Sequence, residues 1–448
     1  MVAKLLGLRP EDRRGALAGF STLVLIMAAH AMLETARDTL FLTHLPPESL
    51  PFCYLGIAAL AVFAARINQR LLARWDKRLV LTATLTVAAA VTLGLWVMVE
   101  GGTEQSLYVL YIWSGLVATV TVVQTWLMVG DFVTVSQAKR VFGVVGAGAV
   151  VGATVGSFAA ERLVAESDPR HLVGGAALVF LAAALEAAFT LRHAAPAFAD
   201  TPRRPLTRGL AAGANVSMLR SQPYLRRLLL LVLVGTVVFT GSDYVFKSVV
   251  IAEIPVAELP SFFARFYLGL NVIALLVQLL LSSFLLRVLG VNRTLLVLPV
   301  LMLFGVAGVG AGSALISVLL LKGADGSLRH SVHRTATEVL YLPLPADVRE
   351  RFKVIIDAVG QRGGQAAASL AILGAVYLGA GTAHLAMALG LLITVWLLTL
   401  LDIEKHYVQL FRGNLRAGTI DTRISLTALD LHSLEALIGA LNSEDDGE

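Results

Sequence analysis

The sequence predicts an all-α integral membrane protein with twelve transmembrane helices, arranged as two six-helix halves with a short cytoplasmic helical tail. The composition is the first observation: 57% of the residues are hydrophobic and 15% are charged, with a mean hydropathy of +0.77, whereas soluble domains average about 25% charged residues. Apolar runs of about 20 residues, the length of a transmembrane helix, also recur along almost the whole chain. Finally, Lys and Arg gather in every second loop between these runs. A β-barrel would show short alternating segments instead.

The apolar runs divide the chain into twelve expected spans. The first run follows EDRR and is too long for the apolar core of a signal peptide, so we expect it to remain as an anchor. The expected spans lie near residues 15–43, 50–71, 79–99, 106–131, 141–163, 171–192, 226–252, 260–287, 293–310, 312–342, 352–379 and 382–402.

Charges in the loops give the expected orientation. Basic stretches such as RINQRLLARWDKR, SQAKR and RVLGVNR fall at the start of the chain, after every even span and at the end. The remaining loops, such as THLPPES and VEGGTEQ, contain almost no Lys or Arg. By the positive-inside rule, both termini are expected in the cytoplasm. This topology also accounts for the pI near 9.4, so we expect the lipid bilayer, and no nucleic acid, as a partner.

The longest internal loop divides the expected spans six and six. We expect an N-terminal six-helix half at 1–192, a cytoplasmic central loop at 193–225, a C-terminal six-helix half at 226–402 and a cytoplasmic tail at 403–448. This is the layout of a two-halved secondary transporter of the major facilitator type, which binds its substrate between the halves near the membrane midplane.

The tail predicts one amphipathic helix. In DLHSLEALIGALNSED, one helical face carries Leu434, Leu437, Ile438 and Leu441. One such helix cannot bury its own apolar stripe, and it resembles the opening helix of a HEAT-type repeat. A cytoplasmic repeat domain would then continue beyond residue 448; the alternative is that the helix packs on the transporter.

Charged side chains lie within the expected spans, where each costs about 2.5–3.5 kcal/mol at the bilayer centre unless it faces a partner or a watery cavity. They are Glu34, Arg37, Asp38, Asp131, Asp243, Lys247, Lys322, Asp325, Arg329, His330, His333, Arg334, Glu338, Lys353, Asp357 and Arg362. Two interpretations are open. Spacing of four residues allows internal ion pairs within Asp243/Lys247, Arg334/Glu338 and Lys353/Asp357. Alternatively, guanidinium groups left over from such pairs suit phosphate or carboxylate.

Other glycine and histidine motifs indicate helix packing or give only weak evidence of a functional site. Gly148, Gly152 and Gly156 recur every four residues, so a neighbouring helix can approach closely there. Gly323 and Gly326 flank Asp325 and are expected to break the tenth span. The pair His330 and His333 is a weak metal signal, and Cys53 is the one cysteine, so no metal site is expected. No nucleophile and base pair or cofactor loop stands out, so we expect neither a cofactor nor an enzyme.

At this point the motifs resemble the ATP/ADP translocase family of nucleotide transporters. ETARDTLFL is similar to its first-span signature, with Arg37 where the family usually has Lys, and QAKRVFGVVGAGAVVGATVG is similar to its Ala-Lys-Lys/Arg-Phe stretch. Asp243 and Lys247 fall on its Glu-Val-Thr-Trp-Lys pattern, and TATEVLYLPLPADVRERFKVIIDAVGQRGG matches at Glu338, Lys353, Asp357 and Arg362. Ser114 stands where the family has a fourth-span acid. Some bacterial members are fusions to HEAT repeats.

The resemblance and the charges together predict a site. Substrate contacts are expected from Arg37, Lys247, Arg334, Lys353, Arg329 and Arg362. Charge-orienting or coupling roles are expected for Glu34, Asp38, Asp243, Glu338 and Asp357. The resemblance implies a multi-pass secondary transporter in the bacterial inner membrane, which moves ATP, ADP or another phosphorylated anion by alternating access. The alternatives are a carrier of the same fold for another organic anion or a lipid, and a membrane sensor or scaffold that acts through a cytoplasmic repeat domain.

Overall fold

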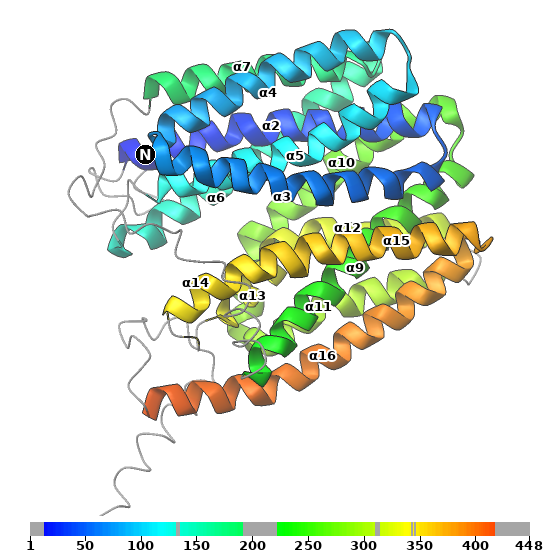
Figure 1. The fold of residues 1–448 in the computed structure, drawn as a ribbon. Coiled ribbons are helices and arrows are strands. Elements are labelled where there is room, and N and C mark those ends of the chain that lie inside the picture. Colours follow the sequence, from blue (N-terminus) through cyan, green and yellow to red (C-terminus); the bar gives the residue numbers. More distant parts are fainter. Residues whose placement is uncertain are drawn as a thin grey trace, which may run out of the picture. The chain divides into compact units, whose positions relative to one another are not determined.

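The structure, a computed structural model, describes residues 13–130, 135–190, 222–309, 314–341, 344 and 346–416. The regular structure of these residues is entirely helical (Figure 1). Three predictions lie outside the described residues: the amphipathic tail helix with Leu434, the charge at Asp131, and most of the central loop 193–225.

Apart from the central loop between α7 and α9, the helices follow one another with short connections. Their bounds are α2 Arg13–His44, α3 Leu50–Arg74, α4 Lys77–Glu100, α5 Glu104–Val129, α6 Val135–Glu166, α7 His171–Thr190, α9 Pro223–Glu253, α10 Leu259–Leu276, α11 Ser282–Val309, α12 Ala314–Leu328, α13 Arg334–Val339, α14 Ala346–Ile355, α15 Gly364–Tyr377 and α16 Thr382–Arg416. Wider π-helical turns join α10 to α11, α12 to α13 and α14 to α15, over Val277–Leu281, Arg329–His333 and Ile356–Gly363.

Local sequence explains where individual helices begin and end. The carboxylate of Asp76 caps α4, because it accepts a hydrogen bond of 2.8 Å from the backbone N–H of Arg78. That helix ends at Gly101 and Gly102, and Gly102 takes the left-handed conformation with φ of 64°. Gly379 does the same after α15, with φ of 78°. Glycine adopts this conformation at no steric cost, so both glycines turn the chain back between helices.

In the described residues, nine helices are long and apolar enough to cross a membrane. The first seven predicted spans correspond to α2 to α7 and α9. The predicted loop between the eighth and ninth spans is wrong, because the backbone stays helical through residues 288–292. The stretch RVLGVNR contains one Gly and no Pro, so little in it ends a helix. The tenth and eleventh spans are interrupted by π-helical turns.

The chain forms two compact units. The first comprises residues 1–206 with 254–275, and the second comprises 207–253 with 276–448. Most of α10 therefore belongs to the first unit, although it follows the central loop in sequence. Asn271 of α10 donates a hydrogen bond of 2.8 Å to the buried Ser157 of α6, which ties this helix to the first unit.

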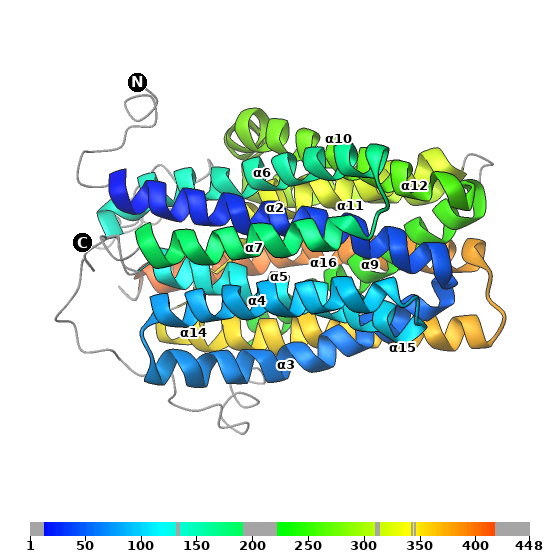
Figure 2. The same ribbon diagram turned by 90° about the horizontal axis from the view of Figure 1, so that it is seen from above.

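In the first unit, α2 packs against α5, α6 and α7, with which it runs side by side (Figures 1 and 2). Its contact with α6 is a glycine seam, Gly148, Gly152 and Gly156. A Cβ at Gly148 would lie 2.8 Å from the backbone oxygen of Phe20, and the other two face Val24 and Ala28 still more closely. This confirms the packing role predicted for the glycines, since only a missing side chain allows such an approach.

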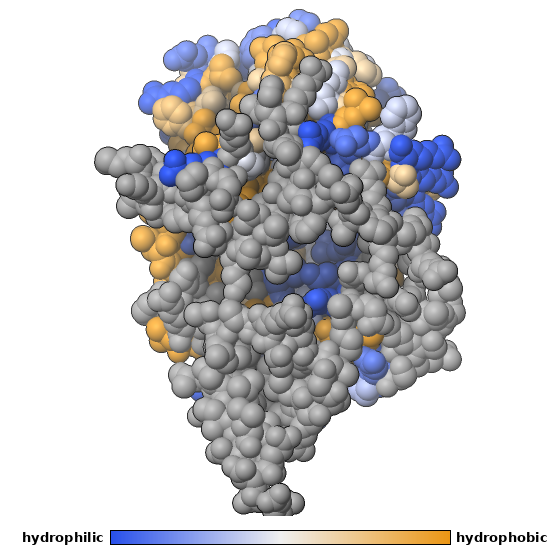
Figure 3. Space-filling view, turned by 90° about the vertical axis from the view of Figure 1, so that its left-hand side faces the viewer, coloured by the Kyte–Doolittle hydropathy of each residue, from blue (hydrophilic) through white to orange (hydrophobic). Residues whose placement is uncertain are grey.

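In the second unit, α9 packs against α12, α15 and α16, and α11 packs against α12 and α16. Large apolar side chains point away from both units: Phe304 is 73% exposed, Leu391 71% and Leu178 66%. Figure 3 shows orange, hydrophobic side chains of this kind on one face of the molecule beside blue, hydrophilic ones. Exposed apolar surface on long apolar helices suits contact with lipid tails.

Candidate functional site

The first unit contains a charged cluster in the C-terminal third of α2. The Arg37 guanidinium donates from Nε to Asp38 Oδ1 at 2.9 Å and from Nη2 to Asp38 Oδ2 at 3.2 Å. Its Nη2 also lies 3.3 Å from Glu34 Oε1. The Asp38 side chain is fully buried, that of Arg37 is 14% exposed, and that of Glu34 is 48% exposed. The structure thus brings together the three charges that the sequence predicted in this helix.

Two other helices complete this cluster. From α5, Ser114 accepts from Arg37 Nη1 at 3.3 Å, and the Tyr111 ring lies 4.6 Å from the guanidinium carbon of Arg37. From α10, the Tyr267 hydroxyl donates to Asp38 Oδ2. Sequence reasoning missed Tyr111 and Tyr267, because a tyrosine in an apolar run carries no signal of a buried charge nearby. Each nitrogen of the guanidinium therefore faces an acceptor of the protein.

The second unit contains a longer series of alternating charges, which we call the charge chain: Lys247, Asp243, Lys322, Asp325 and Arg329. It begins on α9, where Lys247 Nζ donates to Asp243 Oδ2 at 2.8 Å. Lys322 of α12 donates to the other oxygen of Asp243 at 2.7 Å. The Lys247 side chain is fully buried. The ion pair predicted from the spacing of Asp243 and Lys247 is confirmed, and a second cation shares the same carboxylate.

The charge chain continues along α12 to its end. Lys322 Nζ lies 3.4 Å from Asp325 Oδ2, and Arg329 Nη1 lies 3.7 Å from Asp325 Oδ1. The guanidinium carbon of Arg329 also lies 4.1 Å from the centre of the Phe239 ring. The Asp325 side chain is 3% exposed, whereas that of Arg329 is 37% exposed. The charge chain therefore has a buried end at Lys247 and an open end at Arg329.

Backbone irregularity coincides with the predicted site residues. Gly323 and Gly326 lie inside α12, so the break expected at the glycines is wrong. The irregularity comes after them instead, where the π-helical turn Arg329–His333 opens at Arg329. A second such turn, Ile356–Gly363, carries Asp357 and Arg362. Isolated π-helical turns often mark functional sites in helices.

A third set of predicted residues surrounds Glu338, which is paired with Lys353. Lys353 Nζ donates to Glu338 Oε2 at 2.6 Å and lies 5.0 Å from the centre of the Tyr341 ring. The two predicted pairs Arg334/Glu338 and Lys353/Asp357 do not form among the described residues. Asp357 instead accepts from Gln361, at 3.3 Å.

The backbone explains one of these differences. The π-helical turn Ile356–Gly363 begins between Lys353 and Asp357, and its wider winding rotates Asp357 off the face that an α-helix would give it. Arg362 donates to Gln365 at 3.4 Å, and Arg334 is exposed. The basic residues of this set are thus nearer to solvent than Lys247.

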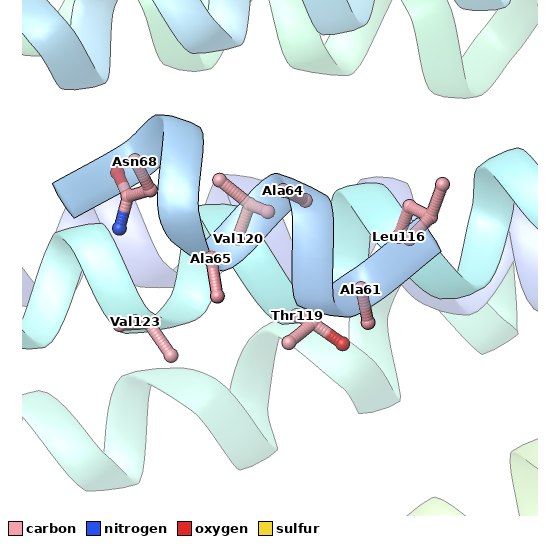
Figure 4. A pocket seen from close by; sticks show the side chains of 8 residues that line it. All are labelled: Ala61, Ala64, Ala65, Asn68, Leu116, Thr119, Val120 and Val123. Atoms are coloured by element: carbon pink, nitrogen blue, oxygen red, sulfur yellow. The ribbon is translucent and has the colours of Figure 1, made fainter. Parts of the chain in front are cut away.

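None of these charged residues lines the pocket shown in Figure 4. It lies between α3 and α5 and is lined by Ala61, Ala64, Ala65, Asn68, Leu116, Thr119, Val120 and Val123. Asn68 is the polar end of this pocket, and it accepts a hydrogen bond of 2.8 Å from the buried Gln124. No residue that the sequence predicted as functional lines this pocket, so the charged clusters remain the candidate site.

Comparison with known proteins identifies the fold. No protein-family model matches the chain, and no curated protein sequence matches it. Among solved structures it is similar to PepTSo, a transporter of the POT family, with a TM-score of 0.64 and 13% identity over 87% of this chain and 98% of that one. It is also similar to the nucleoside transporter NupG, with a TM-score of 0.63 and 12% identity over 89% of this chain and 100% of that one.

A third similar structure is the human organic anion transporter MFSD10 (TETRAN), with a TM-score of 0.56 and 16% identity over 88% of this chain and 100% of that one. These likenesses show that the chain is an all-helical membrane protein with the twelve-helix fold of major facilitator superfamily transporters. The predicted fold class is therefore confirmed. At such identities the likeness concerns the fold, and it does not extend to what the neighbours carry.

Proposed function

We propose that the chain is a secondary transporter that moves a nucleotide, such as ATP or ADP, or another phosphorylated anion by alternating access. The observation that supports this most strongly is the composition of the charge chain. It contains three cations, Lys247, Lys322 and Arg329, and two carboxylates, Asp243 and Asp325. Among these five residues the cations therefore outnumber the carboxylates by one. Such an excess charge is expensive to keep in a membrane unless it has a partner, which an anionic substrate would supply.

Arg329 is the residue best suited to contact that substrate. In the part of the chain that the structure describes, its nearest carboxylate is that of Asp325 at 3.7 Å, beyond hydrogen-bond range, and its guanidinium lies over the ring of Phe239. A guanidinium held this way keeps donors for the oxygens of a phosphate, which it can bind in a bidentate manner. Lys353, Arg334 and Arg362 add basic groups nearer to solvent in the same unit.

We also propose, from the motifs around Arg37, Lys247 and Lys353, that the chain is a member of the ATP/ADP translocase family. Such a member would lie in the bacterial inner membrane with both termini in the cytoplasm.

A carrier of the same fold for another organic anion or a lipid is the second candidate. It is favoured by Arg37, whose nitrogens all face protein acceptors, including Ser114 where the translocases have an acid. The sensor alternative depends on the expected tail helix with Leu434, which lies outside the described residues.

Uptake by liposomes that contain the purified full chain would test the proposal. We expect uptake of α-labelled ATP or ADP above that of empty liposomes, and faster uptake when the liposomes contain unlabelled nucleotide. Labelled malate serves as a comparison, because it is a carboxylate anion without phosphate. Uptake of malate alone would favour the second candidate. The proposal would be overturned if folded protein took up no nucleotide and none raised its thermal stability.

A pair of variants makes this experiment specific. Arg329→Gln removes the cation at the open end of the charge chain, and we expect at least about tenfold weaker nucleotide binding, since hydrogen bonds to charged groups contribute about 1.5–3 kcal/mol. Arg227→Gln is the control. Arg227 lies in the same unit and is paired with Asp402 at 2.5 Å, away from the charge chain. Equal losses in both variants would indicate a general effect of removing an arginine.

A further inference from the structure

The C-terminal part of α3 carries three arginines, Arg66, Arg70 and Arg74, which we call the arginine row. They recur every four residues and therefore lie along one side of the helix. All three are exposed, and no ion pair or hydrogen bond of their side chains is found in the described part of the chain. Asp76, the acid nearest to them in the sequence, already caps α4. The arginine row is thus a set of cations without an anionic partner among the described residues.

An apolar row runs beside these arginines and consists of Phe63, Ile67, Leu71 and Trp75, which are 59%, 55%, 39% and 55% exposed. Each arginine is followed directly in the sequence by a member of the apolar row, and one residue is about 100° of rotation around a helix. The two rows are therefore neighbours on the outer surface of α3. Trp75 marks the end of the apolar row, and tryptophan is enriched where a helix meets the membrane surface.

The pocket of Figure 4 lies on the other side of the apolar row. Ala64, which lines the pocket, directly follows Phe63. Asn68, which also lines it, directly follows Ile67. From α5, Val123 lines the pocket and is 46% exposed, so the pocket opens at the surface of the first unit. Around α3, the arginine row, the apolar row and the pocket therefore follow one another in that order.

The same features are also arranged by depth. The apolar span that contains α3 is Pro47–Arg74, so Arg74 is its last residue and Ala61, at the far end of the pocket, lies near its middle. These two residues are about 20 Å apart along the helix, comparable to half of a hydrocarbon core of about 30 Å. Between them lies Asn68, whose Oδ1 accepts from Gln124, while no acceptor for its Nδ2 is found among the described residues. The order is therefore cations, an amide donor and an apolar pocket, from the end of the span towards its middle.

We propose that this face of the first unit binds one anionic phospholipid. Its phosphate lies on the arginine row, an ester carbonyl accepts from Asn68, and one acyl chain occupies the pocket between α3 and α5. Guanidinium groups bind phosphate in a bidentate manner. Neighbouring arginines of the row are about 6 Å apart along the helix, so their long side chains can reach one headgroup together. The exposed apolar row and the pocket favour a lipid over a soluble phosphate, because they require an apolar partner.

Lipid binding to the purified full chain is measured by native mass spectrometry, and it does not depend on the proposed function because no nucleotide is involved. The probe is phosphatidylglycerol, and the comparison is phosphatidylcholine, which has the same chains and a phosphate but no net charge. We expect phosphatidylglycerol to bind at least about tenfold more tightly, since each basic residue near a membrane surface adds to the attraction for an anionic lipid. Glycerol 3-phosphate, which has no chains, should not displace it at equal concentration. Equal binding of the two lipids, or such displacement, would overturn the proposal.

A pair of double variants locates the headgroup. Arg70→Gln/Arg74→Gln is expected to bind phosphatidylglycerol at least about tenfold more weakly than wild type. The control, Arg162→Gln/Arg226→Gln, removes two exposed arginines of α6 and α9 and the same amount of charge, and it should bind as wild type does. Equal losses in the two double variants would assign the attraction to net charge and overturn the site on α3.

Filling the pocket tests the position of the acyl chain. Ala64→Leu is expected to weaken phosphatidylglycerol binding by about tenfold, which corresponds to about two buried methylene groups of the chain. Ala59→Leu is the control, because Ala59 is exposed on the same helix and does not line the pocket. Unfolding midpoints in detergent show whether each variant is folded, and Val123→Phe fills the pocket from α5 if Ala64→Leu does not fold. Unchanged lipid binding in a folded, pocket-filled variant would overturn the placement of the chain.

Discussion

The hydroxyl of Tyr267 on α10 donates a hydrogen bond to Asp38, a fully buried carboxylate of α2 that also pairs with Arg37. The two residues are far apart in the sequence, and the bond joins a segment from the second half of the chain to the first compact unit. Asp38 thereby has a neutral donor on Oδ2 in addition to its cation. This is how the first unit accommodates a carboxylate that no solvent reaches.

Removal of this donor should destabilise the first unit. We expect Tyr267→Phe to lower the free energy of unfolding by about 1.5–3 kcal/mol, the usual contribution of a hydrogen bond to a charged group. Tyr108→Phe is the matched control, because Tyr108 contacts the Phe41 ring and no hydrogen bond of its hydroxyl is found in the described part of the chain. Unfolding by denaturant in detergent measures both variants. Equal effects would mean that Asp38 does not depend on Tyr267.

Arg37 and Asp38 should depend on each other for stability. Arg37→Gln leaves the buried Asp38 without its cation, and breaking a buried pair in this way costs about 3–5 kcal/mol. Adding Asp38→Asn removes the stranded charge, so the double variant should be more stable than Arg37→Gln alone. The same unfolding experiment gives the coupling energy. If the double variant is as unstable as the sum of the single ones, the two residues act independently.

The surroundings of Arg37 show which contacts can be predicted from the sequence and which cannot. Charges in an apolar span mark α2 as unusual, and in the structure Glu34, Arg37 and Asp38, which are near neighbours in the sequence, contact one another through Arg37. The sequence could not predict Tyr267, because the contact joins residues that are 229 positions apart and depends on which helices pack together. The number and order of the spans came from hydropathy, which is a local property. The grouping of α10 with the first unit is a property of packing.

The second unit shows where prediction of ion pairs from α-helical spacing fails. Regular α-helical spacing predicted Asp243 with Lys247 correctly, since α9 is uninterrupted there. The same rule gave a wrong pair at Lys353 and Asp357, because a π-helical turn begins between them. No pattern that we identified in RFKVIIDAVGQRGG predicts that π-helical turn. The charge chain itself needed a contact between α9 and α12, which spacing within one helix cannot show.

The glycine seam predicts a steric effect on stability. In Gly152→Ala the new methyl group would lie against the Val24 backbone, and such overpacking costs about 1–3 kcal/mol. Gly143→Ala is a control in the same helix, because a Cβ at Gly143 meets nothing within 4 Å. The control should be as stable as wild type or up to about 1 kcal/mol more stable, since alanine favours helices over glycine. Thermal unfolding in detergent distinguishes them, and equal behaviour would show that α2 and α6 can move apart.

Lys353 allows a substrate contact to be separated from a structural role. Its pair with Glu338 is half exposed, with side chains 43% and 50% exposed, and pairs of this kind contribute about 0–1 kcal/mol to stability. Lys353→Gln should therefore leave the unfolding midpoint close to that of wild type. If Lys353 binds the phosphate groups of ATP, the same variant should bind ATP about tenfold or more weakly, as expected for loss of a charge-assisted hydrogen bond. Glu338→Gln supplies the control, since it breaks the same pair but keeps the cation, and it should bind ATP at least as tightly as wild type. Weakened binding in both variants would assign the effect to the ion pair rather than to contact between Lys353 and the anion.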